Sequence, residues 1–97
     1  MPERINLTYT SGLILHAIAT GQSYGFDIID YTGLPSGTVY PALRRLESAG
    51  LIESVWDHKN ADKSGGPPRK YYRLTRPGRD RLHTLRARYP LLEKIAD

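Results

Sequence analysis

The spacing of apolar residues in this 97-residue sequence changes at Gly50, and this change limits the possible folds most strongly. Before Gly50, apolar residues recur at intervals of three and four, which places their side chains on one face of an α-helix. After Gly50, short segments rich in β-branched and aromatic residues predict strands. A chain of this length forms a single domain. The sequence therefore predicts an α+β domain that is mostly α.

Two short helices are predicted in the first third of the chain. The first covers about residues 8–20 and ends at Gly21. Its apolar stripe is narrow and consists of Leu13, Ile14, Ala17 and Ile18. The second covers about residues 23–32, where Ser23 is placed to act as the N-cap.

The segment from about residue 36 to residue 49 has the clearest helical pattern. At 100° per residue its apolar side chains share one face, formed by Val39, Ala42, Leu43, Leu46 and Ala49. The opposite face is polar and basic, with Arg44 pointing straight outward and Arg45 at its edge. A proline breaks a helix interior, so we expect Pro41 near the first turn, whose amides have no partners in any case.

Two antiparallel strands are predicted at residues 51–57 and 69–74. The polar stretch 58–68 between them predicts a long, positively charged loop. Thr75 is expected to cap a last helix that has Pro77 in its first turn. Three helices, a hairpin and a final helix in this order predict a winged helix-turn-helix over residues 1–74 and a C-terminal dimerisation helix over residues 75–97, packed on the same domain.

Basic residues are concentrated in the second half of the chain. The sequence has 14 Lys and Arg against ten Asp and Glu, a net charge of +4. Residues 58–88 hold ten of the basic residues and two of the acidic ones, so this stretch sums to +8 and the remainder to −4. Such asymmetry favours a surface for a polyanion such as nucleic acid. A well-solvated basic surface without a partner has the same composition and stays an alternative.

Several function classes fit the sequence poorly. It has no cysteine, which removes disulfide frameworks, Cys-based zinc sites and thiol nucleophiles. No apolar run approaches the roughly 20 residues of a membrane span, and no signal peptide is visible. The three histidines show no metal-ligand spacing. We expect a cytoplasmic protein that is not an enzyme, uses no cofactor or metal and does not contact a membrane.

Four sequence blocks occur in order along the chain: Tyr24-Gly25-Phe26-Asp27-Ile28, Gly37-Thr38-Val39-Tyr40-Pro41-Ala42-Leu43-Arg44-Arg45-Leu46-Glu47, Gly50-Leu51-Ile52 and Arg69-Lys70-Tyr71-Tyr72-Arg73-Leu74-Thr75. Together they resemble the PadR-type transcriptional regulators, over about residues 7–83. The resemblance implies a bacterial, dimeric, DNA-binding regulator of the subclass with one C-terminal helix. It implies a repressor that a small molecule, such as a small aromatic effector, releases from DNA.

The helix over residues 36–49 carries the main predicted DNA contacts. Arg44 is placed to bind a guanine edge with both guanidinium nitrogens, and Arg45 suits a phosphate. By the resemblance, the Tyr40 hydroxyl bonds a phosphate. The alternatives are solvated surface arginines, and partial burial of Tyr40 against Tyr24.

The remaining predicted DNA contacts lie at the start of that helix and in the hairpin. Ser36 and Thr38 are placed to cap the helix, to touch phosphate, or both. Basic residues of the hairpin suit a wing that lies along the DNA backbone or minor groove. The full predicted set is Tyr24, Ser36, Gly37, Thr38, Tyr40, Arg44, Arg45, Lys59, Lys63, Arg69 and Lys70.

The last helix predicts a homodimer, because apolar residues recur along it at spacings of three and four over two heptads. A domain of this size does not need that helix for its own core, although intrachain packing is the alternative. By the resemblance, the first helix contributes as well. The predicted interface consists of Leu13, Leu82, Leu85, Tyr89 and Leu92.

Taken together, the sequence predicts a homodimeric repressor that binds double-stranded DNA at an inverted-repeat operator. Its two recognition helices would enter successive major grooves about 34–36 Å apart. No effector site is assigned; Trp56 either lines one or packs in the core. Two alternatives stay open, namely a winged-helix module whose basic face binds an acidic protein, and an enzyme or small-molecule binder on this scaffold.

Overall fold

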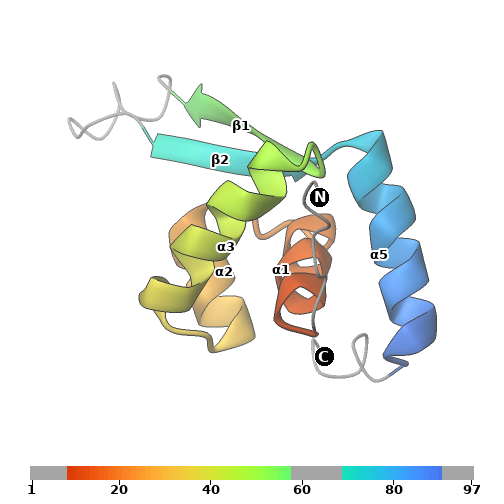
Figure 1. The fold of residues 1–97 in the computed structure, drawn as a ribbon. Helices are drawn as coiled ribbons and strands as arrows, with labels where there is room; N and C mark the ends of the chain where they lie inside the picture. Colours follow the sequence, from red (N-terminus) through yellow and green to blue (C-terminus); the bar gives the residue numbers. More distant parts are fainter. Residues whose placement is uncertain (1–8, 58–68, 91–97) are drawn as a thin grey trace.

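The computed structural model describes residues 9–57 and 69–90. The elements are α1 (Tyr9–Ala19), α2 (Gly25–Thr32), α3 (Ser36–Ser48), β1 (Ile52–Asp57), β2 (Arg69–Leu74) and α5 (Arg76–Arg88). In Figure 1, α1 lies in the middle, α2 and α3 lie on one side of it, α5 lies on the other side, and the hairpin runs along one edge. The predicted fold class, a mostly helical winged helix-turn-helix, is confirmed.

α1 is buried around most of its circumference. Seven of its 11 residues are buried, because α2, α3, β2 and α5 all contact it. The predicted narrow stripe is therefore wrong: Leu15 is also fully buried, and His16 is only 4% exposed. α1 thus forms the centre of the core rather than one wall of it.

The glycine that ends α2 behaves as predicted, but the start of this helix does not. Gly33 has a left-handed backbone with φ 76°, and its N–H donates to the Ile29 carbonyl. The Ser23 cap is wrong, because α2 begins at Gly25 and its N-cap residue makes no side-chain cap. The Ser23 carbonyl instead accepts the Tyr72 N–H at 2.8 Å, so the chain just before α2 lies along the free edge of β2.

α3 has most of the predicted apolar face, with Val39, Ala42, Leu43 and Leu46 buried. The assignment of Ala49 to this face is wrong, because Ala49 is the C-cap residue and is exposed. The expectation for Pro41 is wrong, because the helix begins at Ser36 and places this proline in its second turn. A proline there removes the N–H that would donate to the Gly37 carbonyl. The burial of four apolar side chains in the same helix offsets that cost.

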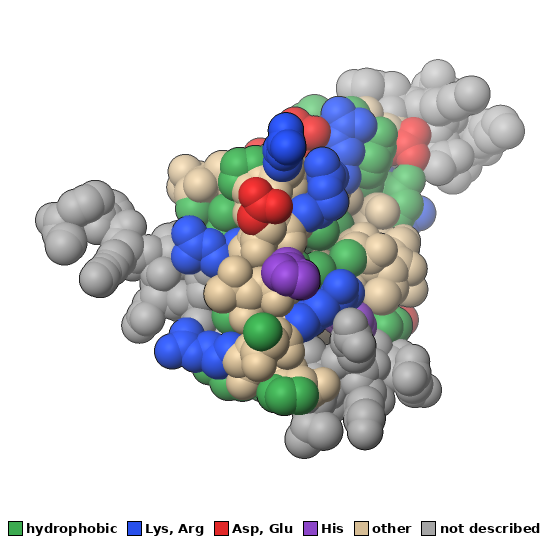
Figure 2. Space-filling model, turned by 90° about the vertical axis from the view of Figure 1, so that its right-hand side faces the viewer, with side chains coloured by type: hydrophobic (Ala, Val, Ile, Leu, Met, Phe, Trp, Pro, Cys, Tyr) green, Lys and Arg blue, Asp and Glu red, His purple; other side chains and the backbone are tan. Residues whose placement is uncertain are grey.

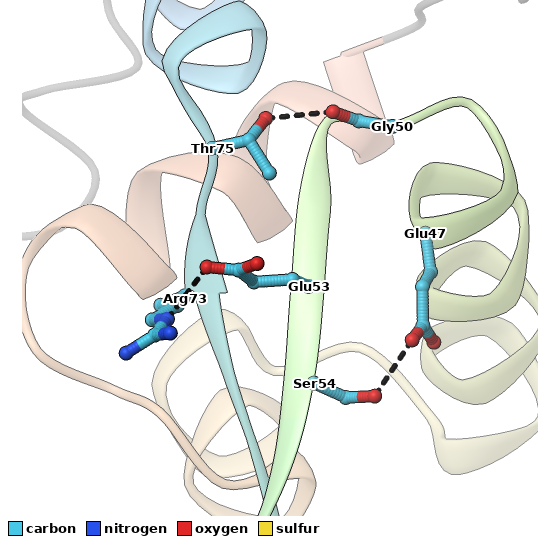
Figure 3. A network of polar contacts seen from close by, with 6 residues as sticks. All are labelled: Glu47, Gly50, Glu53, Ser54, Arg73 and Thr75. Carbon is cyan, nitrogen blue, oxygen red and sulfur yellow. Dashed lines mark hydrogen bonds and ion pairs between the residues drawn. The ribbon is translucent and has the colours of Figure 1, made fainter.

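β1 and β2 pair antiparallel, from Ile52 opposite Leu74 to Asp57 opposite Arg69. α5 then begins as predicted: the Thr75 side-chain oxygen accepts the Gly78 N–H at 3.1 Å. The same Thr75 hydroxyl donates to the Gly50 carbonyl at 2.6 Å (Figure 3). The start of α5 is thereby tied to the turn that connects α3 to β1.

Part of the predicted dimer face belongs to the core of this chain. Leu82 and Leu85 are 3% and 2% exposed and pack in the same apolar cluster as α1. Intrachain packing therefore applies to these two residues, and their assignment to a partner is wrong. Leu13 and Tyr89 are only partly buried against the core, and Leu92 lies outside the described residues.

Within the described ranges, no helix is long and apolar enough to cross a membrane.

Candidate nucleic-acid interface

The outward side of α3 gathers most of the predicted contact residues on one surface. Arg44 and Arg45 are exposed, as are Ser36 and Gly37, and Thr38 is partly buried. Neither Ser36 nor Thr38 caps the helix, because the N-cap residue is Pro35 and makes no side-chain hydrogen bond. The opposite face of α3 is anchored in the core, so the helix axis is fixed while its basic side stays open.

The turn between α2 and α3 is short and held by hydrogen bonds. It consists of residues 33–35, between the end of α2 and the start of α3. The Thr32 hydroxyl donates to the Ile28 carbonyl at 2.7 Å, and the Leu34 N–H donates to the Thr32 oxygen at 3.2 Å. The turn therefore fixes the angle at which α3 leaves α2.

Tyr40 is positioned by a glycine in α2. A Cβ atom built on Gly25 would lie 2.6 Å from Tyr40 Cε1 and 2.8 Å from its hydroxyl oxygen. The ring therefore packs on the backbone at the start of α2, in the space that a side chain at position 25 would occupy. The side chain is nevertheless 40% exposed, so part of it faces outward beside Arg44.

Tyr24 belongs to a cluster at the open end of the hairpin. Its hydroxyl donates to the Asp57 carboxylate, and its ring meets Tyr71 edge to face at 5.9 Å. The Arg69 guanidinium lies over the Tyr24 ring, 4.4 Å from its centroid. Sequence analysis missed the part played by Asp57 and Tyr71, because these contacts join positions far apart in the chain. The cluster holds Arg69 at the base of the predicted wing.

The other face of the hairpin carries an exposed aromatic residue beside a basic one. Trp56 lies opposite Lys70 in the strand register, and the Lys70 ammonium is 5.6 Å from the centre of the indole ring. Trp56 is 55% exposed, so the alternative that it packs in the core is wrong, and it does not line the hollow between α1, β2 and α5 described below. The predicted wing residues Lys59 and Lys63 lie outside the described residues.

Two polar contacts keep the hairpin in place. The Ser54 hydroxyl donates to the Glu47 carboxylate at 2.6 Å, which joins β1 to α3 (Figure 3). Across the hairpin, Arg73 and Glu53 form an ion pair at 2.7 Å. Burial raises the pKa of the Tyr72 phenol, and the nearby Glu47 carboxylate acts in the same direction. Tyr72 therefore stays neutral and packs as an apolar residue.

A hollow of about 550 Å³ lies between the end of α1, β2 and α5. Its polar lining is basic, with Arg73, Arg79, His83 and Arg86 around it, and Ile18 contributes to the apolar part. A terminal nitrogen of the Arg86 guanidinium lies 2.9 Å from His16 Nδ1 in α1.

In the part of the chain that the structure describes, no three His, Cys, Asp or Glu residues could jointly hold a metal ion.

A helix anchored on one side and basic on the other, presented by a short turn next to a two-stranded hairpin, defines the winged helix-turn-helix class. Residues 14–84 match the family model described as the Transcriptional regulator PadR-like family. This chain belongs to that family.

Solved structures of family members, and one further protein sequence, are similar to this chain. A PadR family transcription regulator from hypervirulent Clostridium difficile is 34% identical, with a TM-score of 0.74, and the match covers 91% of this chain and 94% of that one. A PadR-like transcription factor from Bacteroides fragilis is 31% identical, with a TM-score of 0.72 and coverages of 89% and 84%. An uncharacterised protein of Lysinibacillus sphaericus is 28% identical, over 92% of this chain and 85% of that protein.

Proposed function

We propose that this PadR-family regulator is a homodimeric repressor that reads an inverted-repeat operator in double-stranded DNA through the outward side of α3. The observation that carries the proposal is the exposure of Arg44 and Arg45 beside Tyr40, on a helix whose other side is buried. An arginine that projects from such a helix can bind guanine N7 and O6 in the major groove. Arg45 and the Tyr40 hydroxyl then bind phosphates, which fix the register but carry no sequence information.

The hairpin is the proposed wing. Arg69 and Lys70 lie at its open end and are each held over an aromatic ring, Tyr24 and Trp56 respectively. Side chains held in this way lose less conformational freedom when they bind phosphate than free surface lysines do. The wing therefore adds affinity beside the major groove that α3 reads.

The proposed dimer contact lies at the start of α1 and the end of α5. Leu13 is only partly buried, and the rings of Tyr9 and Tyr89 meet edge to face at 5.4 Å. A twofold axis brings the same surface of both copies together. Two α5 helices paired along their length would oppose their arginines, so we place the interface near Leu13 and Tyr89.

The proposal includes release by a small aromatic effector. The hollow between α1, β2 and α5 has the volume of a small-ligand site, typically about 300–1,000 Å³. It is built from α5 as well as from the winged-helix elements. A ligand that favours one arrangement of α5 would change the spacing of the two α3 helices and hence the affinity for the operator.

Selection from a randomised duplex library, followed by sequencing, tests the proposal. We expect an inverted repeat whose half-sites lie about one helical turn apart. Arg44→Ala should lose about 1–3 kcal/mol of binding free energy, mainly at one base position in each half-site. Arg45→Ala is the matched control and should weaken all sequences alike. Recovery of no motif would contradict the proposal and favour a module that binds an acidic protein.

A further inference from the structure

Trp56 is the single tryptophan of the sequence, and more than half of its side chain is exposed. The proposed function gives Lys70 a phosphate but gives Trp56 no contact of its own with DNA. An exposed indole leaves a large apolar surface in water, and covering that surface is favourable. A partner that covers the indole would gain this free energy, and the surroundings of Trp56 indicate the chemistry of that partner.

Trp56 lies on the face of the hairpin that is turned toward α3. Side chains two residues apart on a strand share a face, so Trp56 shares its face with Ser54, whose hydroxyl donates to the Glu47 carboxylate of α3 (Figure 3). Tyr72 is opposite Ser54 in the register, and its phenol lies within electrostatic reach of Arg44 in α3. Trp56 is two residues further toward the open end of the hairpin, at the edge of the surface that α3 and the hairpin form together.

A cation lies over one side of the indole. The Lys70 ammonium is 5.6 Å from the centre of the Trp56 ring and 6.0 Å from that of Tyr72. A wedge that separates two bases needs both of its faces free, so Lys70 disfavours insertion of the indole between bases. An apolar surface next to a single positive charge instead matches one nucleotide of the DNA backbone, which has a carbon-rich deoxyribose and an anionic phosphate.

Neither an exposed aromatic ring nor a basic surface identifies such a site by itself. Phe26 is 66% exposed, but its helix, α2, carries Asp27 and Asp30 and no basic residue, so it would repel a phosphate. Figure 2 shows the side of the molecule formed by α5, where Lys and Arg side chains are spread over the surface. None of the large exposed apolar side chains of the described residues lies on α5. Trp56 combines an exposed ring with a neighbouring cation.

A duplex read by α3 brings a backbone strand to this position. A helix that lies in the major groove, which is about 12 Å wide, has a sugar–phosphate strand on each side. The hairpin stands on one side of α3 and is joined to it by Ser54 and Glu47. The strand on that side therefore passes between α3 and the open end of the hairpin, next to Trp56 and Lys70.

We propose that Trp56 and Lys70 form a clamp for one nucleotide of the DNA backbone, in which the indole packs on the deoxyribose and the ammonium binds its phosphate. The clamp rests on the proposed function, because α3 brings the strand to it. A deoxyribose carries no base identity, so the clamp adds affinity for every sequence alike. The indole contributes to this affinity without a charge, whereas Lys70 contributes through its charge.

Salt dependence separates the two parts of the clamp. With the full chain and the selected operator, Trp56→Ala should weaken binding about ten-fold, within the range found for aromatic residues that stack on nucleic acid. The salt slope should stay unchanged, because no charge is lost. Lys70→Gln should lower that slope by about 0.9. Trp56→Phe keeps a ring and should retain most of the affinity, and Phe26→Ala is the matched control and should retain all of it.

Hydroxyl-radical footprinting tests the sugar contact directly, because the radical attacks exposed deoxyribose. The parent and Lys70→Gln should protect a sugar in each half-site that Trp56→Ala leaves open. In the parent, tryptophan emission should move to shorter wavelength when the duplex displaces water from the indole. The same protection and affinity in Trp56→Ala would overturn the clamp, as would emission that the duplex does not change. Unchanged thermal unfolding confirms that all variants fold.

Failure of the clamp is distinguishable from failure of the proposed function. If selection recovers an operator but Trp56→Ala binds it like the parent, the clamp is wrong and the reading role of α3 stands. If selection recovers no operator, the emission and the salt slopes are measured with a duplex of unrelated sequence. A shift in emission and a ten-fold loss in Trp56→Ala would then support the clamp without the operator, and the absence of both would overturn it.

Discussion

α3 and α5 are both 13-residue helices packed on the same core, but they differ in charge and in presentation. α5 carries more arginines, yet it follows directly after β2 and lies across α1 from the helix-turn-helix pair. α3 carries fewer charges, but a short turn and the hairpin hold it with its basic side outward. The way in which the turn and the hairpin hold a helix with its basic side outward, rather than its number of arginines, therefore marks the proposed DNA-reading helix.

The two helices are also held in different ways. α3 has no side-chain cap and contains a proline, so its position depends on the apolar side chains that it buries. α5 also buries apolar side chains, Leu82 and Leu85, but its start is held in addition by the Thr75 side-chain cap and by Gly78, whose backbone lies directly against the Leu51 carbonyl. Glycine positions in the two helices should therefore respond in opposite ways to an added methyl group.

The largest effect is expected for Gly78→Ala in α5. The new Cβ would lie 1.9 Å from the Leu51 carbonyl oxygen, which also accepts the Thr75 N–H at 3.1 Å. Because the neighbour is backbone, the start of α5 must move away and lose this bond. We expect the free energy of unfolding to fall by roughly 3 kcal/mol or more in urea denaturation.

Gly37→Ala in α3 is the matched control. No atom lies within 4 Å of a Cβ built on Gly37, and alanine favours the helix by up to about 1 kcal/mol over glycine. Stability should stay the same or rise slightly. Similar losses in both variants would show that the two helices do not differ in the way described.

A smaller effect, on affinity alone, is expected for Gly25→Ala. The added methyl group meets the end of the Tyr40 side chain, which can rotate away and leave the fold intact. If the Tyr40 hydroxyl binds phosphate, affinity for the operator should fall about ten-fold, since a hydrogen bond to a charged group contributes about 1.5–3 kcal/mol. Electrophoretic mobility shift and thermal unfolding measure the two quantities.

Tyr40→Phe provides the control for this result. It should lower affinity to a similar degree, and the double variant Gly25→Ala/Tyr40→Phe should be no weaker than Tyr40→Phe alone. Additive losses would mean that Gly25 affects binding by another route, and the positioning of Tyr40 would have to be abandoned.

Much of the fold could be predicted because the local signals agree with the packing. The Gly33 stop, the Thr75 cap and the apolar face of α3 from Val39 to Leu46 each follow from short-range patterns, and all three are confirmed. The errors arise where tertiary contacts override such patterns. His16 is buried although it is polar, because it meets Arg86 of α5. Ser23 loses its capping role because its carbonyl pairs with β2.

The candidate site shows the same division. The basic side of α3 could be predicted from helical periodicity, because exposure on a helix follows from spacing alone. The cluster of Tyr24, Asp57, Arg69 and Tyr71 could not, because it depends on how the start of α2 meets the hairpin. Leu82 and Leu85 have the spacing of a dimer seam, yet they complete the core around α1. Spacing identifies an apolar face but does not identify what covers it.

The central claim is that α3, and not the more basic α5, faces the operator. The sequence contains no cysteine, so Ser48→Cys on α3 and Thr84→Cys on α5 each introduce one thiol for a DNA-cleaving iron chelate. Both positions are exposed. Cleavage of the selected operator should concentrate in two clusters about one helical turn apart when the probe is on α3, and should show no preferred position when it is on α5. Focused cleavage from α5, with none from α3, would contradict the account.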